Sequence, residues 1–191
     1  MKQTIENLAK AFVGESQARN RYTFYASIAK NEGYEQIAEI FTQTADHEKS
    51  HAKRLFEHLK ELTKGKVPSV DVETTVPLMF NKTIQNLEAS IAGETHEYKE
   101  MYPDFAKVAE KEGLKALAFR FLSIAKAEAH HAERYKKLLD LLKSGKLFKR
   151  DKQTTWACRE CGYVHTGLTP PIKCPSCDHP PAFYQVKSET Y

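Results

Sequence analysis

The sequence lacks the features that mark secreted, membrane and nucleic-acid-binding proteins. It has no N-terminal apolar run that could act as a signal peptide, and no stretch approaches the roughly 20 apolar residues of a membrane span. The formal net charge is only +4, without basic clusters or a reading motif for nucleic acid. A flavin or nicotinamide fingerprint is missing too. We therefore expect a cytoplasmic protein that binds neither membranes nor nucleic acids.

Cysteine is scarce and confined to one short region. All four cysteines belong to two C-x-x-C pairs, Cys158 with Cys161 and Cys174 with Cys177, separated by twelve residues. Disulfides of a secreted fold would be scattered, whereas paired spacing in a non-secreted chain indicates a metal site. We predict that the four thiolates hold one ion tetrahedrally. The chemistry suits zinc or iron equally, and the abundance of zinc ribbons favours structural zinc from spacing alone.

Proline is nearly absent from the long amphipathic runs between residues 4 and 143, where apolar residues recur every three or four positions. Gly33 and Gly113 suit helix C-termini followed by tight turns. The link from Lys64 to Phe80 is too long for such a turn and suggests a crossover along the bundle. We predict an all-α four-helix bundle in residues 1–147, with helices at 4–31, 35–63, 81–112 and 114–143.

Helical periodicity stops after about Leu147, and Gly, Pro, Thr and Cys then dominate. Residues 152–191 are too few to build a sizeable core, so a metal has to hold this part together. We predict a second, small domain of strands and loops there.

The helical region contains an internal repeat. Matched positions are Gly14-Glu15 with Gly93-Glu94, 79 residues apart, and then Tyr22 with Tyr102, His51 with His131, and Arg54 with Arg134, 80 residues apart. The second copy therefore holds one extra residue between Glu94 and Tyr102. A single-residue insertion in a continuous helix is typical of a π-bulge, and such bulges concentrate at functional sites. We predict a π-bulge or kink between Glu97 and Pro103.

Each predicted helix interrupts its apolar stripe with one glutamate: Glu15, Glu48, Glu94 and Glu128. An unpaired buried carboxylate costs several kcal/mol or takes up a proton. Buried salt bridges are one remedy, but few Lys or Arg lie on these stripes. Bound metal cations are the other remedy, and we favour them.

Two of these glutamates begin a Glu-x-x-His, with His51 after Glu48 and His131 after Glu128. Residues at i and i+3 leave the same side of a helix. One Glu from each of two helices, with Glu-x-x-His from the other two, is the ligand pattern of di-iron carboxylate bundles. Such oxygen-rich ligand sets suit iron or manganese better than zinc.

Other polar residues lie near this predicted site. Glu97 follows Glu94 by three positions, and a bulge would turn it from a solvated surface residue into a further ligand. Tyr22 and Tyr102 occupy equivalent repeat positions near the inner face, as core residues or as hydrogen-bond donors to ligand carboxylates. We expect three other histidines at the surface or behind the ligands: His47, His58 and His96.

With both sites considered, the chain resembles rubrerythrin from end to end. The segments that carry the resemblance are Gly14-Glu15-Ser-Gln-Ala-Arg-Asn-Arg-Tyr22, Glu48-Lys-Ser-His51-Ala-Lys-Arg54, Gly93-Glu94-Thr-His-Glu97-Tyr98, Glu128-Ala-His-His131 and the knuckles between Cys158 and Cys177. The resemblance implies a ferritin-like bundle with two irons, followed by a rubredoxin-like domain whose cysteines hold a third iron, with zinc as a possible substitute.

The resemblance also implies the ligand roles. Glu48 and Glu128 would bridge the two irons, Glu15 would bind one of them, and Glu94 with His131 would bind the other. The first iron would take Glu97 when oxidised and His51 when reduced. Four side chains are then expected to take part in the reaction: Glu97, His51, Tyr22 and Tyr102.

The activity implied by the resemblance is a peroxidase that reduces hydrogen peroxide to water in oxidative-stress defence. Electrons would pass from the cysteine-bound iron to the di-iron site, supplied by a separate NAD(P)H-linked reductase or a rubredoxin-like carrier. A homodimer is expected by the same analogy. The alternatives are a ferroxidase or iron-storage protein and, in another class, a zinc-ribbon scaffold without catalysis. Oxygen in place of peroxide as the oxidant also stays open.

Overall fold

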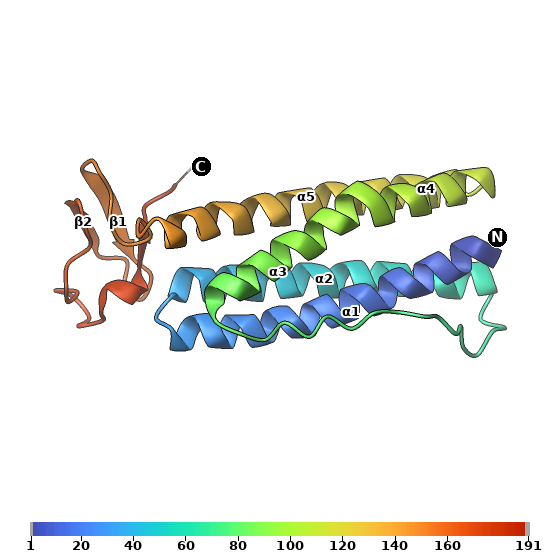
Figure 1. Ribbon diagram of the computed structural model, residues 1–191, viewed down its shortest axis with the longest axis horizontal. Helices are drawn as coiled ribbons and strands as arrows, with labels where there is room; N and C mark the ends of the chain where they lie inside the picture. Colours follow the sequence, from blue (N-terminus) through green and yellow to red (C-terminus); the bar gives the residue numbers. More distant parts are fainter. Residues whose placement is uncertain (1, 190–191) are drawn as a thin grey trace.

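Two long antiparallel helices open the chain. The computed structural model describes residues 2–189, and in it α1 (Lys2–Asn31) and α2 (Glu35–Thr63) pack side by side along their whole length (Figure 1). Gly33 ends the first of them with a φ of 82°, a conformation that glycine adopts without strain. The predicted tight hairpin is confirmed.

The second half repeats this hairpin with an interruption. It consists of α3 (Thr83–His96), the π-helical turn η1 (Glu97–Met101), α4 (Tyr102–Lys111) and α5 (Lys115–Lys143). The predicted π-bulge is confirmed, because η1 absorbs the residue that the first repeat lacks. The helix predicted at 81–112 is thus three consecutive segments, and it begins at Thr83 since the chain before it is still extended.

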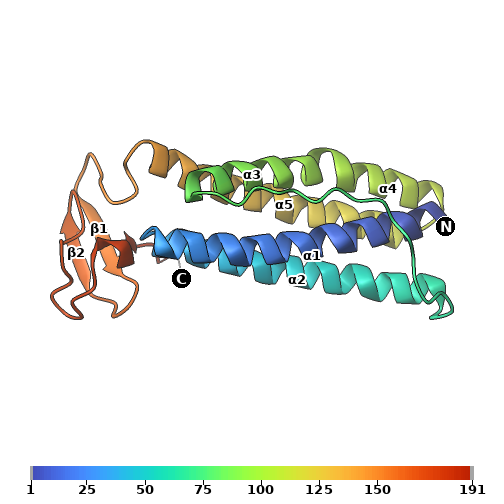
Figure 2. The same ribbon diagram turned by 60° about the horizontal axis from the view of Figure 1, so that its bottom comes forward.

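The predicted crossover is confirmed as well. Residues 64–82 form no helix or strand and run the length of the bundle beside α1 (Figures 1 and 2). The Tyr25 hydroxyl on α1 donates a hydrogen bond of 2.6 Å to the Met79 carbonyl. Phe24 and Phe80 meet edge to face with 6.3 Å between ring centroids. These contacts tie the end of the crossover to α1.

The bundle has two apolar clusters rather than one. Tyr25, Phe41 and Tyr135 belong to the cluster nearer the strand domain, and Leu55 and Phe121 to the other. On every helix the predicted glutamate falls between the residues of one cluster and those of the other. The carboxylates therefore occupy a polar layer enclosed by apolar side chains on both sides.

The C-terminal region is a three-stranded antiparallel sheet in the order β2-β1-β3: β2 (Val164–Gly167), β1 (Thr154–Cys158) and β3 (Tyr184–Val186). Trp156 is fully buried there beside two of the cysteines. Arg159 joins this sheet to the bundle, since its guanidinium contacts the Glu39 carboxylate on α2. The expected fold, a helical bundle followed by a small strand-and-loop domain, is confirmed. Among residues 2–189 there is no helix whose length and apolar character would let it cross a membrane.

Candidate metal centres

Four helices each deliver one buried glutamate to the middle of the bundle. The exposed fraction is 1% for Glu15, Glu48 and Glu94 and 0% for Glu128. With the two histidines they form two adjacent groups whose ligand atoms all lie within 4.8 Å of one another: Glu15, Glu48, His51 and Glu128; and Glu48, Glu94, Glu128 and His131. Because Glu48 and Glu128 belong to both groups, they lie between two candidate ion positions.

The polar atoms of these groups are not satisfied by one another. Within the described chain, one or both carboxylate oxygens of each glutamate and the Nδ1 of His131 have no hydrogen-bond partner. That Nδ1 lies 2.7 Å from Glu128, 3.2 Å from Glu48 and 3.6 Å from Glu94. One nitrogen cannot donate to three carboxylates, so the atoms are arranged around a point that suits a cation. The donor set therefore fits two iron ions.

Proton equilibria of the metal-free site reflect the crowding of charge. Burial, and then the neighbouring carboxylates, raise the pKa of Glu94 to about 8 even though His131 opposes the shift. Burial also raises the pKa of Glu15 well above its usual value. For Glu48 burial acts in the same direction, but the nearby imidazoles of His131 and His51 prevail and lower its pKa to about 2. The site without metal therefore retains protons that metal ions would displace.

A tyrosine of each repeat donates a hydrogen bond to a glutamate of the other repeat. The Tyr22 hydroxyl from the first repeat donates to Glu94 of the second at 2.5 Å, and the Tyr102 hydroxyl from the second donates to Glu15 of the first. Both tyrosines are buried, so each hydroxyl fixes one carboxylate oxygen and leaves the other free. Of the two alternatives for these tyrosines, the structure shows hydrogen bonds to the predicted ligand carboxylates.

Glu97 and His51 occupy different positions relative to the candidate ions. The Nδ1 of His51 lies 3.0 Å from Glu128 and 3.1 Å from Glu48, inside the first group. Glu97, on η1, lies outside both groups and is partly exposed. Burial of its carboxyl, followed by repulsion from Glu15 and the other site carboxylates, raises the pKa of Glu97 well above normal. His51 is thus among the candidate ligands, whereas Glu97 is not.

His47 makes a contact that the sequence did not specify. Its Nδ1 lies 3.1 Å from the Nε2 of His131, and the two rings stack with centroids 5.2 Å apart. His47 itself is exposed at the edge of α2. A partner on the outer nitrogen of a metal-binding histidine fixes which nitrogen faces the metal. In the sequence, only the position of His47 directly before Glu48 hints at the contact with His131. A histidine next to a glutamate is too common to predict such a contact.

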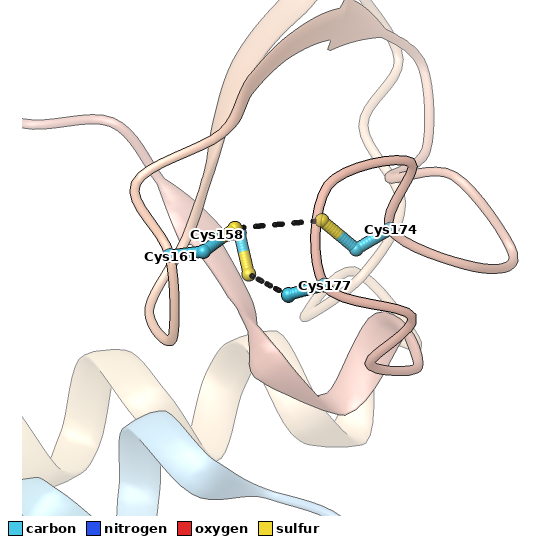
Figure 3. A group of neighbouring side chains, drawn as sticks. All are labelled: Cys158, Cys161, Cys174 and Cys177. Atoms are coloured by element: carbon cyan, nitrogen blue, oxygen red, sulfur yellow. Dashed lines mark hydrogen bonds between the residues drawn. The ribbon is translucent and has the colours of Figure 1, made fainter.

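The four cysteines meet at the other predicted site (Figure 3). The sulfurs of Cys158 and Cys177 lie 3.7 Å apart, as do those of Cys161 and Cys174. Four sulfurs at about 2.3 Å from one ion lie about 3.8 Å from one another in a tetrahedron, so the spacing fits a bound metal.

Each C-x-x-C pair forms a tight turn, called a knuckle here, and the two knuckles have the same backbone geometry. Gly162 follows the first knuckle with a φ of 77°, and Asp178 follows the second with a φ of 63°. Aspartate adopts this left-handed conformation at a modest cost, so it serves where glycine is more usual. Both residues also donate their backbone N–H to the carbonyl of the first cysteine in their knuckle, Cys158 or Cys174.

The metal-free protein should lose stability as the pH rises. Glu94 and Glu15 have raised pKa values in the folded state, so the folded chain binds more protons than the unfolded chain above the ordinary Glu value of 4.5. His131 acts in the same direction above pH 6.5, because the carboxylates close to it outweigh burial and raise its pKa to about 12. We expect the melting temperature of metal-free protein to fall by roughly 10 °C between about pH 5 and pH 8.

Differential scanning calorimetry with and without iron would measure this. Metal ions need deprotonated ligands, so the iron-loaded protein should gain stability over the same pH range. A metal-free melting temperature that rises with pH would show that the buried carboxyls and His131 do not retain extra protons in the folded state.

Comparison with known families matches both parts of the chain. Residues 6–139 match the rubrerythrin family, and residues 156–185 match the rubredoxin-like domain of rubrerythrins. A putative rubrerythrin of Methanocaldococcus jannaschii is 55% identical, with 100% of this chain and 96% of the relative aligned. The rubrerythrin of Nitratidesulfovibrio vulgaris is 45% identical, with 96% and 93% aligned.

Solved structures show the same fold. A nigerythrin in its mixed-valence state superposes with a TM-score of 0.65 at 33% identity, covering 96% of this chain and 86% of that one. A bacterioferritin of Desulfovibrio desulfuricans, described by its di-iron site, superposes with a TM-score of 0.68 at 26% identity, covering 76% and 82%. The bundle is therefore ferritin-like.

The matches and the geometry agree on the cofactors. The bundle carries a carboxylate-bridged di-iron site, and the C-terminal cysteines form a rubredoxin-like iron site. Its relatives indicate an oxidoreductase that uses a redox partner. Since the relatives align over nearly their whole length and both family domains are present in order, the chain belongs to the rubrerythrin family.

Proposed function

We propose that this protein is a peroxidase that reduces hydrogen peroxide to two waters, consuming two electrons and two protons. The observation that supports it most is the coexistence of two unlike sites in one chain, a buried carboxylate–histidine group and a four-thiol group. A di-iron site alone would suit iron storage equally well. The thiol site adds a one-electron carrier that storage does not need.

When bound, two ferrous ions supply both electrons for breaking the O–O bond, and the cysteine-held iron supplies their replacements one at a time. The protein contributes geometry and protons. Tyr22 and Tyr102 hold Glu94 and Glu15 in position, and the two apolar clusters exclude bulk water around the carboxylate layer.

We assign a proton role to Glu97. In the metal-free protein, burial and the neighbouring carboxylates raise the pKa of Glu97 well above normal, which favours its protonated form. If Glu97 were to bind iron in place of His51, as the resemblance implies for the oxidised site, it would have to release this proton, which could then contribute to water formation. Its negative charge would suit ferric iron. One of the two protons that water formation requires would thus come from the protein itself.

The proposed reaction needs an external source of electrons. We propose an external donor, either an NAD(P)H-linked reductase or a rubredoxin-like carrier, which reduces the cysteine domain beginning at about residue 152. The contact of Arg159 with Glu39 lies near the N-terminal end of α2, next to the strand domain (Figure 2). We propose a homodimer in a cytoplasmic setting, to be tested by light scattering on the iron-loaded protein.

An anaerobic single-turnover experiment tests the peroxidase. The iron-loaded protein is fully reduced and mixed with one equivalent of hydrogen peroxide, and the ferric absorption of both sites is followed by stopped flow. Rapid oxidation with no hydroxyl radical trapped would support the proposal. The bacterioferritin-like bundle favours a ferroxidase as the second candidate. Sluggish reaction with peroxide, together with faster oxidation of added ferrous ions by oxygen, would establish that alternative instead.

A further inference from the structure

A cavity of about 340 Å³ reaches Glu97 from the surface. Its walls come from α1, the crossover, and the joined α3, η1 and α4 segments, with Glu97 among the lining residues. Two other lining residues, Gly14 and Gly93, directly precede the buried Glu15 and Glu94 in the chain, and Glu97 lies about one helical turn after Glu94. The cavity therefore borders the segments that carry two of the buried carboxylates.

Two glycines line this cavity at equivalent positions of the repeat, Gly14 on α1 and Gly93 on α3. Each lies inside a helix, where glycine destabilises the helix relative to alanine. Neither is required by a positive φ, because neither is among the glycines with that conformation. A Cβ built on either one meets no atom within 4 Å, so close packing does not require glycine either. What both glycines provide is open space beside Glu97.

The cavity wall is polar as well as apolar. Lys10 and Arg21 contribute cationic groups, and Thr75 on the crossover contributes a hydroxyl. Hydrogen peroxide is a small, uncharged molecule that both donates and accepts hydrogen bonds, so a hydrated polar passage suits it. The crossover closes one side of the passage, which gives this long segment a role beyond connecting the two hairpins.

We propose that this cavity is the entrance through which peroxide reaches the ions, and that Gly14 and Gly93 set its width. The entrance would admit hydrogen peroxide and small alkyl hydroperoxides and would exclude bulky ones. This inference rests on the proposed peroxidase function. It adds two specificity-determining residues that touch neither metal nor thiol.

The test is to narrow the passage with Gly14→Leu and Gly93→Leu. Leucine is a better helix former than glycine, and the space beside each glycine is open, so both variants should fold. In the reduced, iron-loaded protein we expect the second-order rate of oxidation by hydrogen peroxide to fall at least about tenfold, about 1.4 kcal/mol in the barrier. The rate with tert-butyl hydroperoxide should fall further. Iron content and the visible spectrum should stay unchanged.

Two variants serve as matched controls. Gly93→Ala is the graded control: it adds only a methyl group, so it should raise the melting temperature of the metal-free protein and lower the peroxide rate less than Gly93→Leu does. Ala92→Leu adds bulk at an exposed position of α3 outside the cavity lining and should not change the rate.

A second readout separates this inference from the proposed function. The association rate of azide with the oxidised iron protein reports access to the ions without any turnover, and it should fall in both leucine variants. If wild-type protein fails to react with peroxide, the peroxidase proposal fails. The azide rates would still show whether the cavity gives access to the ions. If both leucine variants react with azide and with peroxide at the same rates as wild-type protein, the cavity is not the entrance.

Discussion

Cys174→Ser should reduce peroxide turnover supported by an external electron donor at least about 100-fold, because a missing thiolate removes the iron of the C-terminal site. Cys174 is fully buried, and its sulfur lies 3.7 Å from that of Cys161. Serine fits the space, but its hydroxyl is a poor ligand for a thiolate-bound metal. Single-turnover oxidation of chemically reduced protein by peroxide should stay within about twofold of wild type, because the bundle ligands are untouched.

The measurement pairs steady-state NAD(P)H consumption, with an added reductase and rubredoxin, with stopped-flow single turnover on the same preparation. Thr166→Ala, an exposed change on β2, is the control and should leave both rates unchanged. Equal loss of both rates would show that the cysteine domain supports the bundle structurally rather than by electron transfer. Retention of both rates would show that electrons bypass the cysteine site.

Glu128→Gln should reduce the affinity of the bundle for iron at least about 100-fold, more than the effect typical of residues behind the ligands. Glu128 is 0% exposed and belongs to both groups of candidate ligands, so one substitution weakens both ion positions. Glutamine keeps the shape of the side chain but cannot supply the negative charge. Peroxide reactivity should be lost together with the iron.

The same variant should also change the stability of the metal-free protein. Removing the carboxylate charge that lies 3.0 Å from His51 and 2.7 Å from His131 should lower the metal-free melting temperature, and the stabilisation gained on adding iron should shrink as well. Iron stoichiometry and calorimetry with and without iron measure both quantities. Glu133→Gln, at an exposed position on the same helix, is the control and should change neither. Two firmly bound irons in Glu128→Gln would refute a bridging role.

Much of the ligand set is visible in the sequence because helical periodicity is a local property. A glutamate inside an apolar stripe, as at Glu15 or Glu94, has to face the core wherever the helix packs. The extra residue of the second repeat had to be absorbed within the helix, and η1 begins at Glu97 within the predicted interval. The cysteine pairs are equally local, since each knuckle requires only a few adjacent residues.

Relations between distant segments needed the tertiary structure. The crossed hydrogen bonds of Tyr22 with Glu94 and Tyr102 with Glu15 link residues 72 and 87 positions apart, and no local pattern specifies them. The stacking of His47 on His131 likewise depends on how α2 and α5 pack.

The sequence by itself thus determined which residue types face the core and the place of the π-helical turn. Only the tertiary structure decided that His51 lies within a candidate ion-binding group while Glu97 lies outside both groups, and that Gly14 and Gly93 border one cavity. The physical reason is the range of the interactions. Backbone hydrogen bonding and side-chain periodicity act over a few residues, whereas a cavity or a shared ion site exists only where separate helices and the crossover meet.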